Sequence, residues 1–270
     1  MRLRSRIALT ICALFVAGAL GTQAPAGADD TMATIKARGK MIVGVKADYP
    51  PFGFLDNGKN VGLEIDLLHL IAKDMLGNAD AIEFVPVVSA NRFQYLNTSK
   101  VDFLFSTVTI TDARKKVVDF SAPYMKSGWG IMVLRSNPDA VTDAADLGGK
   151  TVVVVPGSTG EAALKAQFPT INRLALTQTS EALQAVSSRR ASAFVQDAAL
   201  LYGLEQQRPD FKVVGKSHDD GDILIGAACR KGDSGPCDFI TKEIAKFTKS
   251  GLLKTEYHTW LHGAENRFMP

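Results

Sequence analysis

Two charged residues of opposite sign stand where predicted strands give way to predicted helices, and together they could bind a small charged molecule. Arg114 ends the segment Thr107–Arg114, where free backbone N–H groups and a positive helix terminus favour an anion. Its planar guanidinium can hold a carboxylate through two parallel hydrogen bonds. The alternative is a solvated arginine on a basic helix face beside Lys115 and Lys116, and the local residues leave both interpretations open.

Asp197, the residue of opposite sign, follows an apolar run and precedes the predicted helix Ala198–Gln206. A carboxylate in that place either caps the helix or pairs with a bound cation. A second strand-to-helix turn has Ser158 and Glu161 at capping-box spacing. Its N–H groups either start an ordinary capped helix or point at an anion.

Other chemistries have little support in the sequence. There is no Gly-x-Ser-x-Gly nucleophile elbow and no GxGxxG, and neither turn ends in Gly-Lys-Ser/Thr. The four histidines are scattered and do not stand at ligand spacing from the cysteines, so we expect neither a metal nor a cofactor. Tyr49 and Phe52, in a proline-rigid loop, are either an aromatic pocket wall or ordinary packing residues.

The elements that must position these residues alternate between strand and helix. Apolar runs predict strands at 40–46, 82–88, 101–106, 129–134, 151–155, around 174, and at 193–195 and 223–229. Helical spacing predicts helices at 63–76, 91–96, 111–116, 161–167, 179–188, 198–206, 238–249 and 252–261. Two such cycles indicate an α/β fold with parallel sheets. Extended crossovers near 126–134 and 222–229 would leave a cleft between two lobes.

The N-terminal residues 1–28 are predicted to be a secretory signal peptide. Three arginines precede the apolar run Ile7–Leu20, and Ala26-Gly27-Ala28 provides an Ala-x-Ala cleavage site. A membrane anchor is disfavoured because the run is shorter than the roughly 20 residues that a spanning helix needs. The three arginines leave with the leader and no acid does, so the formal charge of +3 becomes zero. Charge therefore gives no argument for nucleic-acid or membrane binding.

Two cysteines, Cys229 and Cys237, remain after this leader and are separated by a turn-rich segment. In an exported chain they are predicted to form a disulfide, and two free buried thiols are the alternative.

Seven segments, taken in order, resemble the periplasmic solute-binding proteins of polar amino acid ABC transporters (family 3). They are Val43–Phe52, Gly62–Leu67, Thr109–Arg114, Val118–Tyr124, Asp146–Lys150, Gly157–Thr159 and Phe194–Asp197. Each segment alone is weak, but the ordered set is specific. The resemblance implies two parallel-sheet α/β lobes joined by a two-strand hinge, with lobe I formed by residues 29–125 and 223–270 and lobe II by residues 126–222. It also implies a periplasmic monomer that delivers an amino acid to the permease subunits of an ABC importer, without catalysis.

The resemblance assigns opposite poles of the ligand to the two charged residues. In this family the arginine grips the ligand α-carboxylate, which implies Arg114, assisted by backbone N–H groups at Thr109 and Thr159. The acid after the second lobe's strand binds the α-ammonium, which implies Asp197, assisted by the Thr107 carbonyl and the Thr109 hydroxyl. A buried zwitterion needs both poles matched, and poles on two lobes would favour closure.

The remaining predicted ligand contacts fall on the same matching segments. Ser158 belongs to the turn before Thr159, and Asp48, Tyr49 and Phe52 fall on the family's first ligand loop.

The choice of amino acid is predicted from Lys46, Ser89 and Arg92. In the glutamate/aspartate-binding branch, which this chain resembles here, basic residues at the positions of Lys46 and Arg92 reach the side-chain carboxylate. However, Lys46 is common in members with other ligands, and Arg92 could be a structural helix residue. Ser89 stands where glutamine binders often carry an aromatic lid, which disfavours glutamine.

Two other classes of protein compete with this hypothesis. Cyclohexadienyl dehydratases are enzymes that resemble these binding proteins. An ammonium-pairing acid at Asp197 argues against prephenate as a substrate, but not against arogenate. A sensory domain is disfavoured because the sequence shows no transmembrane or signalling segment after the leader.

Overall fold

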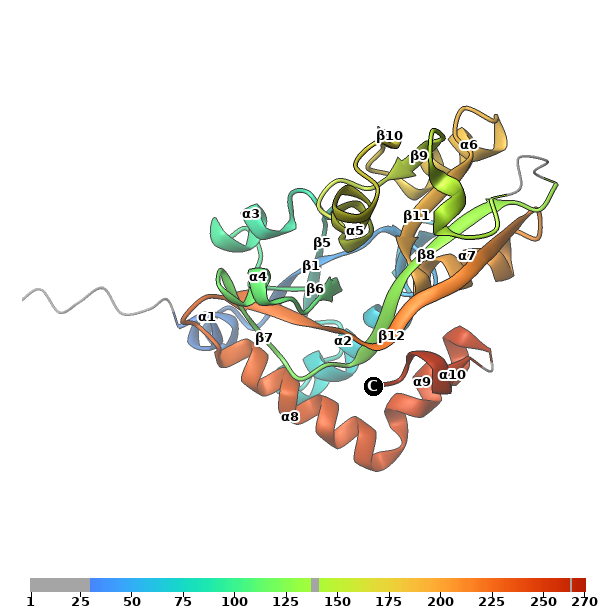
Figure 1. The fold of residues 1–270 in the computed structure, drawn as a ribbon. Coiled ribbons are helices and arrows are strands. Elements are labelled where there is room, and N and C mark those ends of the chain that lie inside the picture. The colour runs from blue at the N-terminus through green and yellow to red at the C-terminus, as the bar shows by residue number, and fades with distance from the viewer. Residues whose placement is uncertain (1–29, 137–140, 263) are drawn as a thin grey trace, which may run out of the picture.

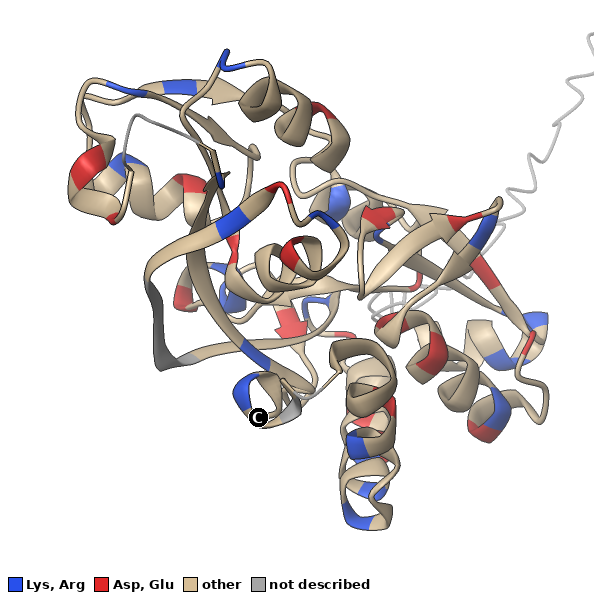
Figure 2. Ribbon diagram, turned by 90° about the vertical axis from the view of Figure 1, so that its right-hand side faces the viewer, with Lys and Arg blue, Asp and Glu red and all other residues tan. Residues whose placement is uncertain are grey.

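A computed structural model describes residues 30–136, 141–262 and 264–270, so the predicted signal peptide at 1–28 lies outside the described residues. Within these ranges, no helix is long and apolar enough to cross a membrane. Acidic and basic residues are interspersed along the ribbon (Figure 2).

A nine-stranded mixed sheet runs through the described chain in the order β10-β9-β11-β8-β12-β6-β1-β5, with β7 beside β12. Its strands are β1 (Met41–Val45), β5 (Ile82–Pro86), β6 (Phe103–Thr109), β7 (Val118–Phe120), β8 (Met125–Leu134), β9 (Thr151–Val154), β10 (Asn172–Ala175), β11 (Ala193–Asp197) and β12 (Phe211–Arg230). A separate small sheet contains β2 (Asp48–Tyr49), β3 (Gly53–Asp56) and β4 (Lys59–Val61).

The large sheet consists of two parallel groups connected by two long strands. β1 pairs in parallel with β5 and β6, and β9 pairs in parallel with β10 and β11. β8 and β12 are antiparallel to each other, and they extend from one group to the other (Figure 1). At the point where both strands pass from one group to the other, Ser127 pairs with Ile223 and Met125 pairs with Ile225. This arrangement is the predicted two-lobed α/β fold with a two-strand connection.

Helices cover the strand groups (Figure 1). They are α1 (Thr31–Arg38), α2 (Leu63–Leu76), α3 (Arg92–Asn97), α4 (Asp112–Lys115), the 3-10 helix η1 (Ala144–Leu147), α5 (Thr159–Gln167), α6 (Thr179–Ser187), α7 (Ala198–Gln207), α8 (Gly235–Ser250), α9 (Leu252–Leu261) and α10 (Glu265–Phe268). The bounds of α2 are those predicted, because its apolar face is buried and Gly77, at φ 76°, accepts the left-handed end that stops a helix.

The strands predicted at 129–134 and 223–229 begin earlier in the structure, although the extended crossover predicted near 126–134 includes almost all of β8. β8 begins at Met125 instead of Trp129, and β12 begins at Phe211 instead of Ile223. The added residues include glycine and charged side chains, which local patterns assign to loops. Pairing between the two strands stabilises them as extended chain, and such pairing is not visible in a local pattern. Helix α1 and the small sheet were also not predicted.

The predicted disulfide between Cys229 and Cys237 is present, and both residues are buried. It connects the end of β12 to the first turn of α8.

Candidate functional site

A small cavity lies where the two strand groups face each other. Its free volume is about 10 Å³, and it is lined by Tyr49, Ser89, Arg92, Thr107, Thr109, Ser158, Thr159, Gln196 and Asp197. All of these except Gln196 are residues predicted for the site. The volume is about that of one water molecule, so an amino acid enters only if the lining groups or the lobes move apart.

Asp197 ends β11 and caps α7. Its carboxylate accepts hydrogen bonds from the backbone N–H groups of Ala199 at 3.0 Å and Leu200 at 3.4 Å, and from the Ser127 hydroxyl at 2.7 Å. The residue is 5% exposed, and burial raises the pKa of its carboxyl to about 6. Asp197 is therefore a helix cap that also faces the cavity, so the capping interpretation and the binding interpretation are compatible.

Arg114 lies beside the cavity and is not among its lining residues. The half-buried guanidinium donates to the carbonyl of Thr109 at 2.9 Å and to the carbonyl of Gly157 at 3.0 Å. It therefore joins the end of β6 to the turn that precedes α5. Burial lowers the pKa of this guanidinium.

The turn before α5 has the Ser158 half of the predicted capping box, while Glu161 accepts from Gly157 instead of from Ser158. The Ser158 hydroxyl accepts from the backbone N–H of Glu161 at 3.1 Å, and the Glu161 carboxylate accepts from the backbone N–H of Gly157 at 2.8 Å. Ser158 and the half-buried Thr159 line the cavity as well. The same turn thus starts a helix and presents polar groups to the cavity.

Lys46 is 3% exposed and lies at the edge of this group of residues. Its Nζ donates to the Ser89 hydroxyl at 3.0 Å and lies 5.1 Å from the centre of the Tyr49 ring. Burial, and then the charge of Arg92, lower the pKa of the Lys46 ammonium to about 7. The hydrogen-bond partner that the structure shows for this buried ammonium is a neutral hydroxyl and not a carboxylate.

Arg92 is 2% exposed and lines the cavity. It donates to the carbonyl groups of Ser106 at 2.9 Å and Thr107 at 3.3 Å, while its Nε has no hydrogen-bond partner among the described residues. Burial, and then the charge of Arg114, lower the pKa of its guanidinium to about 9. Arg92 therefore supports the β6 backbone and also places positive charge at the cavity.

Glu64, in the first turn of α2, was not among the predicted site residues. It is fully buried and accepts hydrogen bonds from the backbone N–H of Thr107 at 2.7 Å and from the Tyr124 hydroxyl. Thr107 has φ 50°, a left-handed conformation that is unfavourable for a residue with a side chain. Glu64 thus fixes the backbone of a residue that lines the cavity. Burial raises the pKa of the Glu64 carboxyl to about 7.

Gln196 was also missed. It is 2% exposed and lines the cavity, and its Oε1 accepts from the backbone N–H of Asp197 at 3.0 Å. Its Nε2 has no hydrogen-bond partner within the described ranges. A polar residue in an otherwise apolar strand, immediately before Asp197, was the available signal.

Two predicted residues lie away from the cavity lining. Phe52 is fully buried in the main apolar cluster, which agrees with its interpretation as a packing residue. Asp48 is half-buried, and its carboxylate accepts from the backbone N–H of Thr179 at 2.7 Å.

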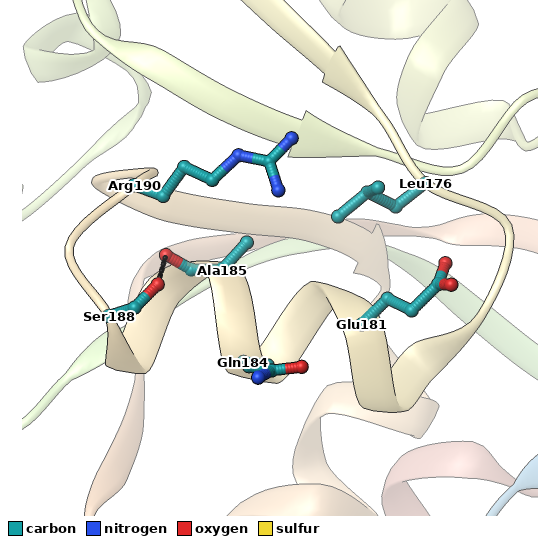
Figure 3. Close-up of a pocket in the computed structure, with 6 residues that line it drawn as sticks. All are labelled: Leu176, Glu181, Gln184, Ala185, Ser188 and Arg190. Atoms are coloured by element: carbon teal, nitrogen blue, oxygen red, sulfur yellow. Dashed lines mark hydrogen bonds between the residues drawn. The ribbon is translucent and has the colours of Figure 1, made fainter.

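Another hollow lies between β10 and α6, with a free volume of about 300 Å³ (Figure 3). Its polar residues Glu181, Gln184, Ser188 and Arg190 are all exposed, unlike those of the interlobe cavity. Desolvated polar groups that converge on one point are typical of a binding site, so the interlobe cavity is the better candidate. Across the described ranges, no group of three or more His, Cys, Asp or Glu side chains could hold a metal ion.

A two-lobed α/β fold with a charged, buried cavity between its strand groups is typical of solute-binding proteins. The sequence profile of the bacterial extracellular solute-binding proteins, family 3, matches residues 41–263. The chain belongs to this family, which confirms the predicted resemblance.

Individual relatives span most of the chain. The ABC transporter glutamine-binding protein GlnH of Bacillus subtilis (strain 168) is 31% identical over 247 residues, which cover 90% of this chain and 89% of that protein. The L-glutamate/L-aspartate-binding protein of Pseudomonas aeruginosa is 29% identical over an alignment that covers 94% of this chain and 88% of that protein. The solved structure of the solute receptor for L-cysteine of Neisseria gonorrhoeae has a TM-score of 0.82 and 33% sequence identity. The match covers 88% of this chain and 99% of that chain. The ligands in these names differ.

The buried carboxyl of Glu64 predicts a pH-dependent contribution to stability. Because its folded-state pKa of about 7 lies above the ordinary 4.5, the carboxyl contributes most below pH 4.5, and the contribution is lost as the pH rises through 7. Relative to Glu64→Gln, the free energy of unfolding of the wild type should fall by roughly 3 kcal/mol between pH 4.5 and 7.5.

Urea denaturation of both proteins over this range measures that difference, and buried groups common to both cancel. The exposed Glu181→Gln variant is the control and should follow the wild type. Parallel curves for Glu64→Gln and the wild type would contradict the assignment.

Proposed function

We propose that this protein is an extracytoplasmic binding protein that captures an amino acid in the interlobe cavity and delivers it to an ABC importer. The observation that carries the proposal is the buried carboxylate of Asp197, which lines the same cavity as the buried guanidinium of Arg92, with Arg114 beside this cavity. Asp197 would bind the α-ammonium and Arg114 the α-carboxylate. Export would use the signal peptide predicted at residues 1–28.

The lobe boundaries that we propose are 29–125 and 223–270 for lobe I and 126–222 for lobe II. The pairing of Ser127 with Ile223, next to both proposed boundaries, supports this division. Arg114 then belongs to lobe I and Asp197 to lobe II. Because the two poles of the ligand are held by different lobes, only a closed form satisfies both, and the ligand shifts the population towards closure.

We further propose that the ligand is an acidic amino acid. Lys46 and Arg92 are both almost fully buried, and neither donates a hydrogen bond to a carboxylate among the described residues. The nearby charges of Asp48 and Glu64 offset only part of the cost of burying Lys46 without an ion pair. A side-chain carboxylate of the ligand would supply the counter-charge that a neutral ligand lacks. The similarity to a relative named for glutamate and aspartate supports this proposal.

Calorimetric titration with glutamate, aspartate, glutamine, cysteine and arginine tests both proposals. The protein should bind glutamate or aspartate more tightly than the other three, because only an acidic side chain pairs with Lys46 and Arg92. If only a neutral amino acid gives a binding heat, the proposal of an acidic ligand is refuted. The proposed amino acid-binding function then still stands. No heat with any of the five, or with the remaining common amino acids, would refute the function.

Replacement of Arg114 by alanine should weaken binding of the best ligand on the order of 100-fold or more, because a buried carboxylate loses its charged partner. The variant should unfold at nearly the wild-type temperature, since the guanidinium is only half-buried and its partners are carbonyl groups. Arg190→Ala, which removes an exposed arginine, is the control. Wild-type affinity in Arg114→Ala would contradict the assignment.

The affinity for an acidic ligand should pass through a maximum between about pH 6 and 7. Below pH 6 the Asp197 carboxyl becomes protonated, and above pH 7 the Lys46 ammonium loses its charge, as their pKa values of about 6 and about 7 indicate. Each limb approaches about tenfold per pH unit. Dissociation constants from pH 5 to 8 measure the profile. Lys46→Met should remove only the alkaline limb, and a flat wild-type profile would contradict both roles.

A further inference from the structure

Asp48 connects two parts of the chain that are far apart in sequence. Its carboxylate lies at 2.7 Å from the backbone nitrogen of Thr179, which is 131 residues further along the chain and begins α6. Under the lobe division proposed above, Asp48 belongs to lobe I and Thr179 to lobe II. We infer that Asp48 is a positioning residue that holds the lobes closed and does not itself contact the ligand.

The start of α6 lacks a cap from its own segment. The first N–H groups of a helix have no intrahelical acceptor, and the residue at the cap position, Gln178, makes no side-chain hydrogen bond to them. Asp48 supplies the missing acceptor from the other lobe, with a negative charge that is favourable at a helix N-terminus. Thr179 is 5% exposed and Asp48 is half-buried, so the contact is partly shielded from water. When the lobes separate, both groups return to water and the interaction is lost.

The loop that carries Asp48 meets lobe II at a second point. A methyl group added at Gly203, in α7, would lie 2.2 Å from Cδ of Pro51 and 3.0 Å from the carbonyl oxygen of Pro50. The two surfaces therefore fit closely, and both contact points lie outside the cavity lining. Gly203→Ala offers a steric perturbation of the same closure, because alanine itself is favourable within a helix.

A contact that exists only in the closed form has a distinct thermodynamic signature. The apparent affinity of every ligand is reduced by the fraction of protein that can close. Loss of the Asp48 contact should therefore weaken all ligands by one common factor and leave their ratios unchanged. A residue that touches the ligand side chain would instead change those ratios.

The test compares Asp48→Ala and Gly203→Ala with Asp56→Ala, which removes an exposed acid from the same small sheet. Calorimetry gives the dissociation constants for the tightest ligand and for a weaker one, and small-angle X-ray scattering gives the radius of gyration of the free protein. For Asp48→Ala we expect a weakening of about tenfold, equal for both ligands, as for a charged hydrogen bond at a helix start. Gly203→Ala should also weaken both equally, and Asp56→Ala should match the wild type.

Unchanged affinities in Asp48→Ala would overturn the inference, and so would a loss confined to one ligand, which would assign Asp48 to ligand contact. If the wild type binds no amino acid, the proposed function fails separately, and the scattering experiment alone decides. A larger radius of gyration in Asp48→Ala and Gly203→Ala than in Asp56→Ala then supports the closure role. Equal radii in all three variants overturn it.

Discussion

The constraint on which the site depends is that charge buried at the lobe interface must be compensated. Lys46, Arg92, Glu64 and Asp197 are each at most 5% exposed, and burial moves the pKa of each group towards its neutral form. Such groups are unfavourable for folding unless hydrogen bonds and opposite charges surround them. The large apolar cluster and the strand pairings supply the stability that allows the fold to keep them.

The hydrogen bonds around these charges lead back to the elements that position the cavity. Glu64 holds Thr107 in its left-handed conformation, and the Tyr124 hydroxyl that also donates to Glu64 belongs to the residue just before β8. Ser127, within β8, donates to Asp197 at the end of β11. Asp197 is therefore bonded to a strand that connects the two strand groups, and Glu64, which fixes Thr107 at the cavity, is bonded to the residue just before that strand. Site geometry and the position of this strand are not independent.

Local patterns predicted the elements well where one segment contains all the information. Helix α2 has its own apolar face and its own stop at Gly77, so its bounds were predictable. β8 and β12 are antiparallel, so the start of each strand pairs with a later part of the other, as Met125 does with Ile225 and Phe211 with Leu134, and no local pattern shows such pairing. The family resemblance brought together most residues of the cavity. Glu64 was missed although it lies in a matching segment, because an acid at a helix start is normally a solvated residue. Gln196 was not predicted because the charged residue next to it, Asp197, already accounted for the end of this strand.

The adjacent crossing points of β8 and β12 also determine how the protein can move. Two strands that are hydrogen-bonded to each other, with Ser127 opposite Ile223, cannot slide independently without breaking their register. Relative motion of the lobes would therefore consist mainly of bending and twisting of this pair of strands. A membrane partner that contacts both lobes could sense the occupied cavity from their relative position, without contacting the ligand.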